Sequence, residues 1–247
     1  MNTTTIEENP GAISHARSRI ARAPATVASM AEQRVNHSLT AALETRILLW
    51  MAERAPRWVS SDQLTLLGLG AQIATGLAYA AAGRHRSALF AAVACVVLNW
   101  LGDSLDGTLA RVRHRQRPRY GFYVDQMVDL FGAIALMTGL GCSGFLHWPV
   151  AVAMLVAFML LASESYLATH TLSLFQLSQG IFGPTEIRIL LIAGTVALLH
   201  SRYATFLGHR LLLFDLGGSI AATAMFAMAL TVTLRHTAQL YRQEPLS

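Results

Sequence analysis

The chain has 247 residues, of which 53% are hydrophobic and only 13% are charged. Because soluble domains have about 25% charged residues, this composition disfavours a soluble protein and indicates a polytopic membrane protein. All 19 basic residues are arginines, and the formal net charge is +5. Most of these arginines flank apolar segments. Topological orientation or anionic lipid headgroups explain that pattern, which argues against nucleic acid as a partner.

The first 58 residues precede the first apolar segment and fall into two parts. Residues 1–30 are rich in Thr, Ser, Ala and Arg, and we expect a flexible cytosolic tail there. Residues 31–58 form a juxtamembrane segment, in which apolar residues recur at helical intervals up to residue 53. We expect an amphipathic helix that lies on the membrane surface. The alternative is an ordinary soluble helix packed against a cytosolic partner.

Residues 59–240 contain six apolar segments that are long enough to form helices. The predicted fold class is all-α: a polytopic integral membrane protein with six transmembrane helices and an N-terminal amphipathic surface helix. The second segment continues without a helix breaker, so its helix should emerge from the membrane at its C-terminal end. The six segments are 63–83, 87–113, 121–142, 149–174, 185–200 and 216–234.

The distribution of arginines predicts the orientation of these helices. Six spans place both termini on one side of the membrane. The terminal segments and the connectors after the second and fourth spans hold 15 arginines, against four on the other side. By the positive-inside tendency, both termini and the connector between the second and third spans face the cytoplasm. We expect a bacterial inner-membrane protein with its functional site on the cytoplasmic side.

Four carboxylates interrupt the second and third apolar segments. Asp103 and Asp106 lie on one face of the second helix, and Asp125 and Asp129 share a face of the third, because each residue turns a helix by about 100°. The two helices are antiparallel neighbours, so all four side chains can meet in one cavity. Ionisable residues within a membrane are costly and indicate a functional site.

Carboxylates in a low-dielectric cavity repel one another and need cations or protons to compensate. Oxygen ligands without nearby His or Cys indicate a hard ion, Mg²⁺ or Mn²⁺, rather than zinc. Mg²⁺ commonly bridges protein carboxylates and substrate phosphates. The carboxylate faces therefore predict a metal site that binds a phosphorylated substrate.

Small residues share the same helix faces. Gly107 and Ala110 lie beside the carboxylates of the second helix, and Gly121 lies beside those of the third. Small side chains allow a ligand or an opposing helix to approach the backbone closely, so ligand binding and helix packing both explain them. Arg111 follows directly and can meet a phosphate oxygen.

The string Asp103-x2-Asp106-Gly107-x2-Ala110-Arg111-x9-Gly121-x3-Asp125-x3-Asp129 resembles the signature of the CDP-alcohol phosphotransferase family, integral membrane enzymes of phospholipid synthesis. All eight fixed positions match. The resemblance also covers the six-helix layout, here residues 59–240, and the surface helix before it. It implies a homodimer embedded in membrane lipid.

The resemblance implies a role for each matching position. Asp103, Asp106 and Asp125 would be the main ligands of a two-metal site for Mg²⁺ or Mn²⁺. Asp129 would be the general base and a further metal ligand. The CDP pocket would be lined by Asp106, Gly107, Ala110, Arg111 and Gly121.

The implied reaction is the transfer of a phosphatidyl or other substituted phosphate group from a CDP-alcohol, first of all CDP-diacylglycerol, with release of CMP. The acceptor would be a polar alcohol, or diacylglycerol if the soluble alcohol is on the nucleotide. Family members often carry a Thr-Pro-Asn-like turn before the first span, where this chain has Ser60-Ser61-Asp62. Ser60, Ser61 and Asp62 are the candidate caps of the first helix, and without the Pro and Asn we expect a capping role for Asp62 rather than contact with a nucleotide.

Polar residues of the fourth and fifth segments are candidates for the acceptor pocket. Glu164 and Tyr166 lie near the cytoplasmic half of the fourth segment, and Glu186 and Arg188 begin the fifth. Arg119 and Arg188 could bind an acceptor phosphate. The alternatives are structural: a Glu164–Arg188 ion pair, a helix-dipole role for Glu186, and an orientation charge at Arg119.

Two other functions would use aspartates in membrane helices. An intramembrane prenyltransferase also holds a pyrophosphate with Mg²⁺, but the contiguous Gly107 and Ala110-Arg111 arrangement argues against it. A cation transporter would spread its carboxylates along a transmembrane path, whereas these cluster toward one side.

Overall fold

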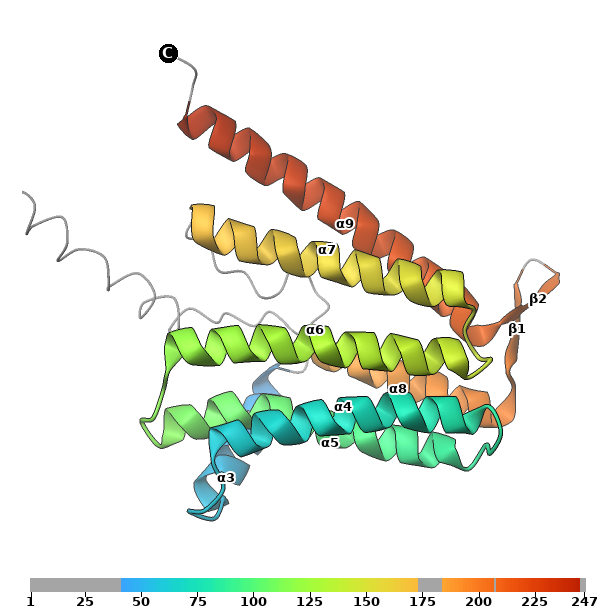
Figure 1. Ribbon diagram of the computed structural model, residues 1–247, viewed down its shortest axis with the longest axis horizontal. Coiled ribbons are helices and arrows are strands. Elements are labelled where there is room, and N and C mark those ends of the chain that lie inside the picture. Colours follow the sequence, from blue (N-terminus) through green and yellow to red (C-terminus); the bar gives the residue numbers. More distant parts are fainter. Residues whose placement is uncertain (1–40, 173–183, 207, 245–247) are drawn as a thin grey trace, which may run out of the picture. The chain divides into compact units, whose positions relative to one another are not determined.

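The computed structural model describes residues 41–172, 184–206 and 208–244. Seven helices and one pair of strands form within these ranges (Figure 1). The predicted tail and the first ten residues of the predicted surface helix lie outside the described residues. The elements are α3 (Ala41–Arg54), α4 (Ser61–Ala82), α5 (Ala88–Val112), α6 (Pro118–Cys142), α7 (Trp148–Leu172), α8 (Pro184–His200), β1 (Tyr203–Phe206), β2 (His209–Leu212) and α9 (Leu213–Gln243).

Each of the six predicted apolar segments forms a helix. Five of these helices, α4, α5, α6, α7 and α9, are long and apolar enough to cross a membrane. The remaining one, α8, has 17 residues, which at 1.5 Å per residue gives about 25 Å. That is less than the hydrocarbon thickness of about 30 Å. The structure thus supports five of the six predicted spans, and a crossing by α8 stays a prediction.

The largest departure from the predicted fold is a β-hairpin between α8 and α9. Strands β1 and β2 pair antiparallel, with Phe206 opposite His209 and Tyr203 opposite Leu212. Gly208 has a φ of +82°, a backbone conformation that glycine adopts without steric cost. The aromatic and β-branched residues of β1 favour a strand. The segment before the last helix is therefore not a simple loop.

Helix α4 packs against both α5 and α6, the two helices that carry the carboxylates (Figure 1). Glycines allow these close approaches. A side chain at Gly102 of α5 would meet the backbone of Gly68 on α4, and one at Gly139 of α6 would meet the backbone of Gly76. These contacts set the positions of both carboxylate-bearing helices relative to α4.

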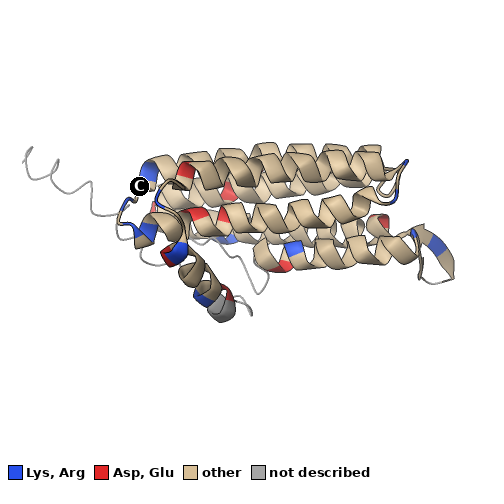
Figure 2. Ribbon diagram, turned by 90° about the horizontal axis from the view of Figure 1, so that it is seen from below, with Lys and Arg blue, Asp and Glu red and all other residues tan. Residues whose placement is uncertain are grey.

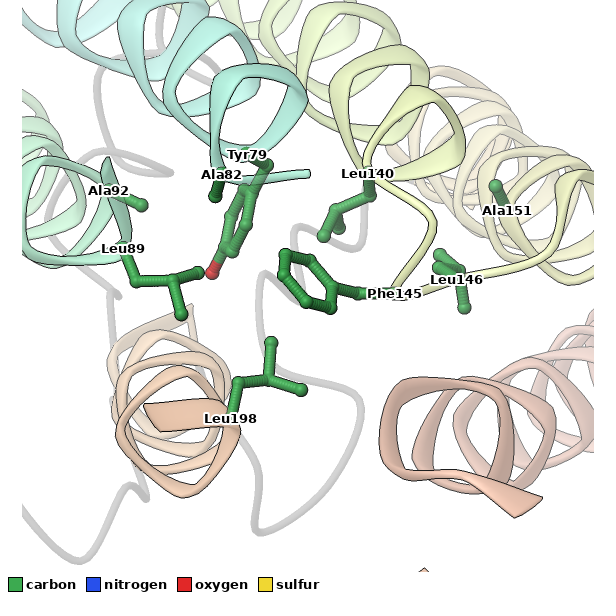
Figure 3. Close-up of a cluster of buried hydrophobic side chains, with 9 residues drawn as sticks. All are labelled: Tyr79, Ala82, Leu89, Ala92, Leu140, Phe145, Leu146, Ala151 and Leu198. Carbon is green, nitrogen blue, oxygen red and sulfur yellow. The ribbon is translucent and has the colours of Figure 1, made fainter. Parts of the chain in front are cut away.

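A buried apolar cluster joins the helices at the end remote from the carboxylates (Figure 3). Within it, the hydroxyl of Tyr79 lies 2.5 Å from that of Thr195, which ties α4 to α8. The ring of Tyr79 also meets Phe214 of α9 edge-on, with 6.1 Å between centroids. The cluster consists of Tyr79, Ala82, Leu89, Ala92, Leu140, Phe145, Leu146, Ala151 and Leu198.

A second apolar cluster docks α3 at the carboxylate end. Leu48 and Ala52 of α3 are buried against Leu64 of α4 and against Leu105 and Leu109 of α5. The α3 helix therefore packs on the helical domain itself. The opposite face of α3 is exposed, since the side chain of Trp50 is 57% exposed. The ring of Trp50 contacts the guanidinium of Arg54.

Large apolar side chains are exposed along the long helices, among them Leu66 and Leu77 of α4 and Phe90 of α5. Arginines lie mostly near helix ends, whereas acidic residues also interrupt the helices themselves (Figure 2). Apolar sides with charged ends are the pattern expected of helices surrounded by lipid.

We expect Gly139→Ala to destabilise the protein by about 1–3 kcal/mol, the usual cost of overpacking, because its Cβ would meet the backbone of Gly76. The matched control is Gly70→Ala on α4, where an added Cβ meets no atom within 4 Å. Thermal unfolding of the detergent-solubilised protein measures the difference. Equal melting temperatures for the two variants would contradict this account of the α4–α6 contact.

Candidate functional site

The carboxylates of α5 and α6 lie within electrostatic reach of one another. Asp129 interacts with Asp103, Asp125 and Asp106, and Asp106 interacts with Asp125 and Asp103. All four side chains are partly buried. The geometry therefore brings together the four aspartates that helical spacing placed on two separate faces.

Asp106 is held by the N-terminal turns of α4. The hydroxyl of Thr65 donates to Oδ2 of Asp106 at 2.6 Å, and the amide of Gly107 donates to Oδ1. The hydroxyl of Ser61 donates to the backbone carbonyl of Asp106 at 2.9 Å. The start of α4 thus fixes both the carboxylate and the backbone of this residue.

The start of α4 is capped by Ser60, one of the three predicted candidates, whereas the capping role predicted for Asp62 is wrong. The hydroxyl of Ser60 accepts from the amide of Gln63, and the Gln63 side chain accepts from the amide of Ser60. Asp62 instead accepts two hydrogen bonds from Arg117, at 2.5 and 2.6 Å. This bonding raises the pKa of the exposed Arg117 guanidinium. Ser60 is the N-cap because its hydroxyl reaches the amide of Gln63, which has no partner within the helix. Asp62 lies within the first turn and is not in the capping position.

Asp103 is paired with an arginine from α8. Nη2 of Arg188 donates to Oδ2 of Asp103 at 2.6 Å, and its Nε donates to Oδ1 of Asn99 at 3.0 Å. Asn99 in turn donates to the carbonyl of Gly68 and to Oε1 of Gln72 on α4. Arg188 therefore reaches the carboxylate site from a helix about 85 residues further along the chain.

Glu164 and Arg188, the alternative structural ion pair, each have a partner on another helix. Oε1 of Glu164 lies 2.5 Å from Nδ1 of His236, so this carboxylate connects α7 with α9. The guanidinium of Arg188 forms an ion pair with Asp103, because the packing of α8 against α5 brings these two side chains together.

Among the other acceptor candidates, Tyr166 interacts with the carboxylates. Tyr166 is within electrostatic reach of Asp129 and Asp125, and its ring meets Phe122 edge-on at 6.1 Å. Glu186 is partly buried in the first turn of α8, whereas Arg119 is exposed in the first turn of α6. Tyr166 is thus beside the carboxylates.

The positions predicted to contact a nucleotide differ in how much room surrounds them. A Cβ added at Gly121 would meet no atom within 4 Å, so packing among the described residues does not require a glycine there. Gly107 and Ala110 are partly buried, and Nη2 of Arg111 donates to Thr108 at 2.9 Å.

Sequence reasoning missed Thr65 and Asn99, which hold the site from α4 and α5. Asn99 precedes Asp103 by four residues, and therefore lies one helical turn away on the same face. The spacing from Asp103 could therefore have identified Asn99 as a residue of the site. Thr65 had no such signal, since its contact with Asp106 spans 41 residues of chain.

The donor set fits a hard divalent cation, because it consists of carboxylates in mutual electrostatic contact. The space directly around Gly121 is open, because an added Cβ would meet no atom within 4 Å. Within the described ranges, however, no group of three or more His, Cys, Asp or Glu side chains is arranged to hold a metal ion. Asp103 and Asp106 take their hydrogen bonds from Arg188 and Thr65.

Comparison with known proteins identifies relatives of this chain. The family model described as CDP-alcohol phosphatidyltransferase matches residues 58–235, which include α4 to α8 and most of α9. The fold is similar to the crystal structure of Mycobacterium tuberculosis phosphatidylinositol phosphate synthase (PgsA1) with CDP-DAG bound. The TM-score is 0.52 at 22% sequence identity, over 79% of this chain and 92% of that chain. A search of curated proteins finds no match.

We expect Arg188→Leu to destabilise the protein by about 2 kcal/mol, because the carboxylate of Asp103 loses a charged hydrogen-bond donor. Mg²⁺ should stabilise the variant more than the wild type, since a cation would bind the carboxylates without competing with the guanidinium. Thermal unfolding with and without Mg²⁺ measures both effects. Arg235→Leu, at an exposed position of α9, is the control, and an Arg188→Leu variant as stable as this control would contradict the pairing.

Proposed function

Because this chain belongs to the CDP-alcohol phosphatidyltransferase family, we propose that it transfers a phosphatidyl group from CDP-diacylglycerol to an acceptor alcohol and releases CMP. The observation that carries the proposal is the convergence of Asp103, Asp106, Asp125 and Asp129. The similar fold of PgsA1, whose crystal structure has CDP-DAG bound, supports this donor. Membership in the family decides against the prenyltransferase and the cation transporter.

The proposed donor half of the site lies on α5 and α6. Asp103, Asp106, Asp125 and Asp129 would hold Mg²⁺ or Mn²⁺, with two ions as the resemblance implies, and such ions would supply positive charge to the pyrophosphate and to the leaving CMP. The small residues Gly107, Ala110 and Gly121 let the nucleotide approach the backbone. Arg111 is assigned to a phosphate oxygen, since its planar guanidinium suits phosphate geometry.

The proposed reaction is an in-line displacement at the phosphorus distal to cytidine. Asp129 takes the proton of the acceptor hydroxyl, and the acceptor oxygen forms a bond to that phosphorus. The bond from the phosphorus to the bridging oxygen breaks, and its electron pair leaves with CMP. Asp129 suits the role of base because its carboxylate lies near the three other carboxylates of the site.

The proposed acceptor half includes Arg188, Tyr166 and Glu186, with Arg119 at its edge. Arg188 is the strongest candidate for an acceptor phosphate or other polar group, because it already lies against Asp103 at 2.6 Å. Glu164 is a weaker one, since it is bonded to His236. The acceptor is a polar alcohol, or diacylglycerol if CDP carries the soluble alcohol.

The proposed setting is a bacterial inner membrane, with the carboxylate end and both termini in the cytoplasm. Residues 1–30 would be a cytosolic tail, residues 31–58 a juxtamembrane segment, and residues 59–240 a catalytic domain of six spans that includes α8. The excess of arginines at the carboxylate end supports this orientation. We propose a homodimer on the resemblance to the family.

Purified protein should release CMP from CDP-diacylglycerol when given Mg²⁺ or Mn²⁺ and an acceptor from a panel. The panel contains glycerol phosphate, inositol phosphate, serine and other polar alcohols, and also pairs CDP-choline or CDP-ethanolamine with diacylglycerol. A chelator should abolish release, because the carboxylates then lack the charge that holds the pyrophosphate. No CMP release with any donor and acceptor pair would overturn the proposal.

Asp129→Asn should lower kcat by about 10²–10⁴-fold, the usual contribution of a general base, while binding of CDP-diacylglycerol is largely kept. Turnover and equilibrium binding of the labelled donor measure the two effects. Asp215→Asn, which affects a carboxylate bonded to His147 at the other end of the helices, is the control. Turnover by Asp129→Asn at the level of this control would sink the assignment of the base.

A further inference from the structure

Glu44 of α3 accepts hydrogen bonds from three side chains that belong to two other helices. Nε1 of Trp100 and Oγ of Ser104, both on α5, donate to Oε1 of Glu44 at 3.1 and 3.3 Å. Oγ1 of Thr185, in the first turn of α8, lies 3.0 Å from each of the two carboxylate oxygens. One carboxylate therefore connects the surface helix with both α5 and the beginning of α8.

The contact at Thr185 bears on the site because Arg188 follows three residues later. Residues three apart on a helix are neighbours on one face. Arg188 makes its own contacts with α5, to Asp103 and Asn99. The first turn of α8 is thus attached to α5 at two levels, through Glu44 at Thr185 and directly at Arg188.

A carboxylate suits this position for a chemical reason. An ionised carboxylate has about four lone-pair sites and donates no hydrogen bond, so it can satisfy an indole N–H and two hydroxyls together. Its negative charge also makes each of these bonds stronger than a neutral one. A glutamine has the same size, but its NH₂ group replaces one of the acceptors.

We propose that Glu44 is a positioning residue for the acceptor half of the site. Through Thr185 it holds the first turn of α8, and thereby the direction in which Arg188 presents its guanidinium. The inference rests on the proposed function, which assigns Arg188 to the acceptor. It makes α3 a part of the enzyme's acceptor site, in addition to its packing against α4 and α5.

The test compares the KM for the acceptor with the KM for CDP-diacylglycerol, using the full chain in lipid nanodiscs. Glu44→Gln and Thr185→Val should each raise the acceptor KM at least about tenfold, since small misplacements of binding groups cost up to about 10²-fold. The donor KM should change less than about twofold, because binding to α5 and α6 is kept. Thr185→Ser keeps the hydroxyl and should behave as the wild type. Glu53→Gln, at an exposed position of the same helix, is the control.

Three results would overturn the inference alone. A normal acceptor KM in a folded Thr185→Val variant does so, even if Glu44→Gln is unstable. Equal rises in both KM values show a general structural defect. If Thr185→Ser raises the acceptor KM as much as Thr185→Val does, the hydroxyl has no role in acceptor binding. Wild-type protein that releases no CMP with any acceptor overturns the proposed function and this inference with it, whereas the first three results leave the proposed function intact.

Discussion

Four carboxylates on two apolar helices repel one another, and the helices around them provide the groups that offset this repulsion. Thr65 of α4 donates to Asp106, and Arg188 of α8 pairs with Asp103. Neither donor is close in sequence to the aspartate that it holds. The site can therefore form only when α4 and α8 are packed against α5, so the stability of the fold and the geometry of the site depend on the same contacts.

Helix α4 contributes both to the stability of the fold and to the geometry of the site. Its glycines let α5 and α6 approach its backbone, through Gly102 against Gly68 and Gly139 against Gly76. Its N-terminal turns hold the backbone and the carboxylate of Asp106. Small residues at helix contacts are the usual solution in membranes, where apolar side chains gain little by leaving lipid for a protein contact. Helix α4 contributes no aspartate to the motif, yet its contacts determine where the carboxylates of the motif lie.

The two halves of the proposed reaction depend on different parts of the chain. The donor half is contained in one continuous stretch, from Asp103 to Asp129, that supplies all of the family's motif positions. The proposed acceptor half combines residues of α7 and α8 and, through the contact of Glu44 with Thr185, includes α3. Parts that are far apart in sequence can change separately from the motif. In the proposed reaction, the motif would supply the chemistry shared by the family, and the surrounding helices would select the acceptor.

The sequence by itself determined the six apolar helices, the family and the grouping of the four aspartates, because hydrophobic runs and helical spacing are local properties. Asn99 was within reach of the same spacing argument. Only the tertiary structure decided that Arg188 pairs with Asp103, that Glu164 pairs with His236, and that Ser60 is the one of the three candidate residues that caps α4. It also decided the hairpin before α9 and the bonds of Glu44. Apart from the cap at Ser60 and the hairpin, which are local, these features depend on which helices lie side by side. Hydrogen bonds across 56 to 141 residues of chain leave no periodic trace in the sequence.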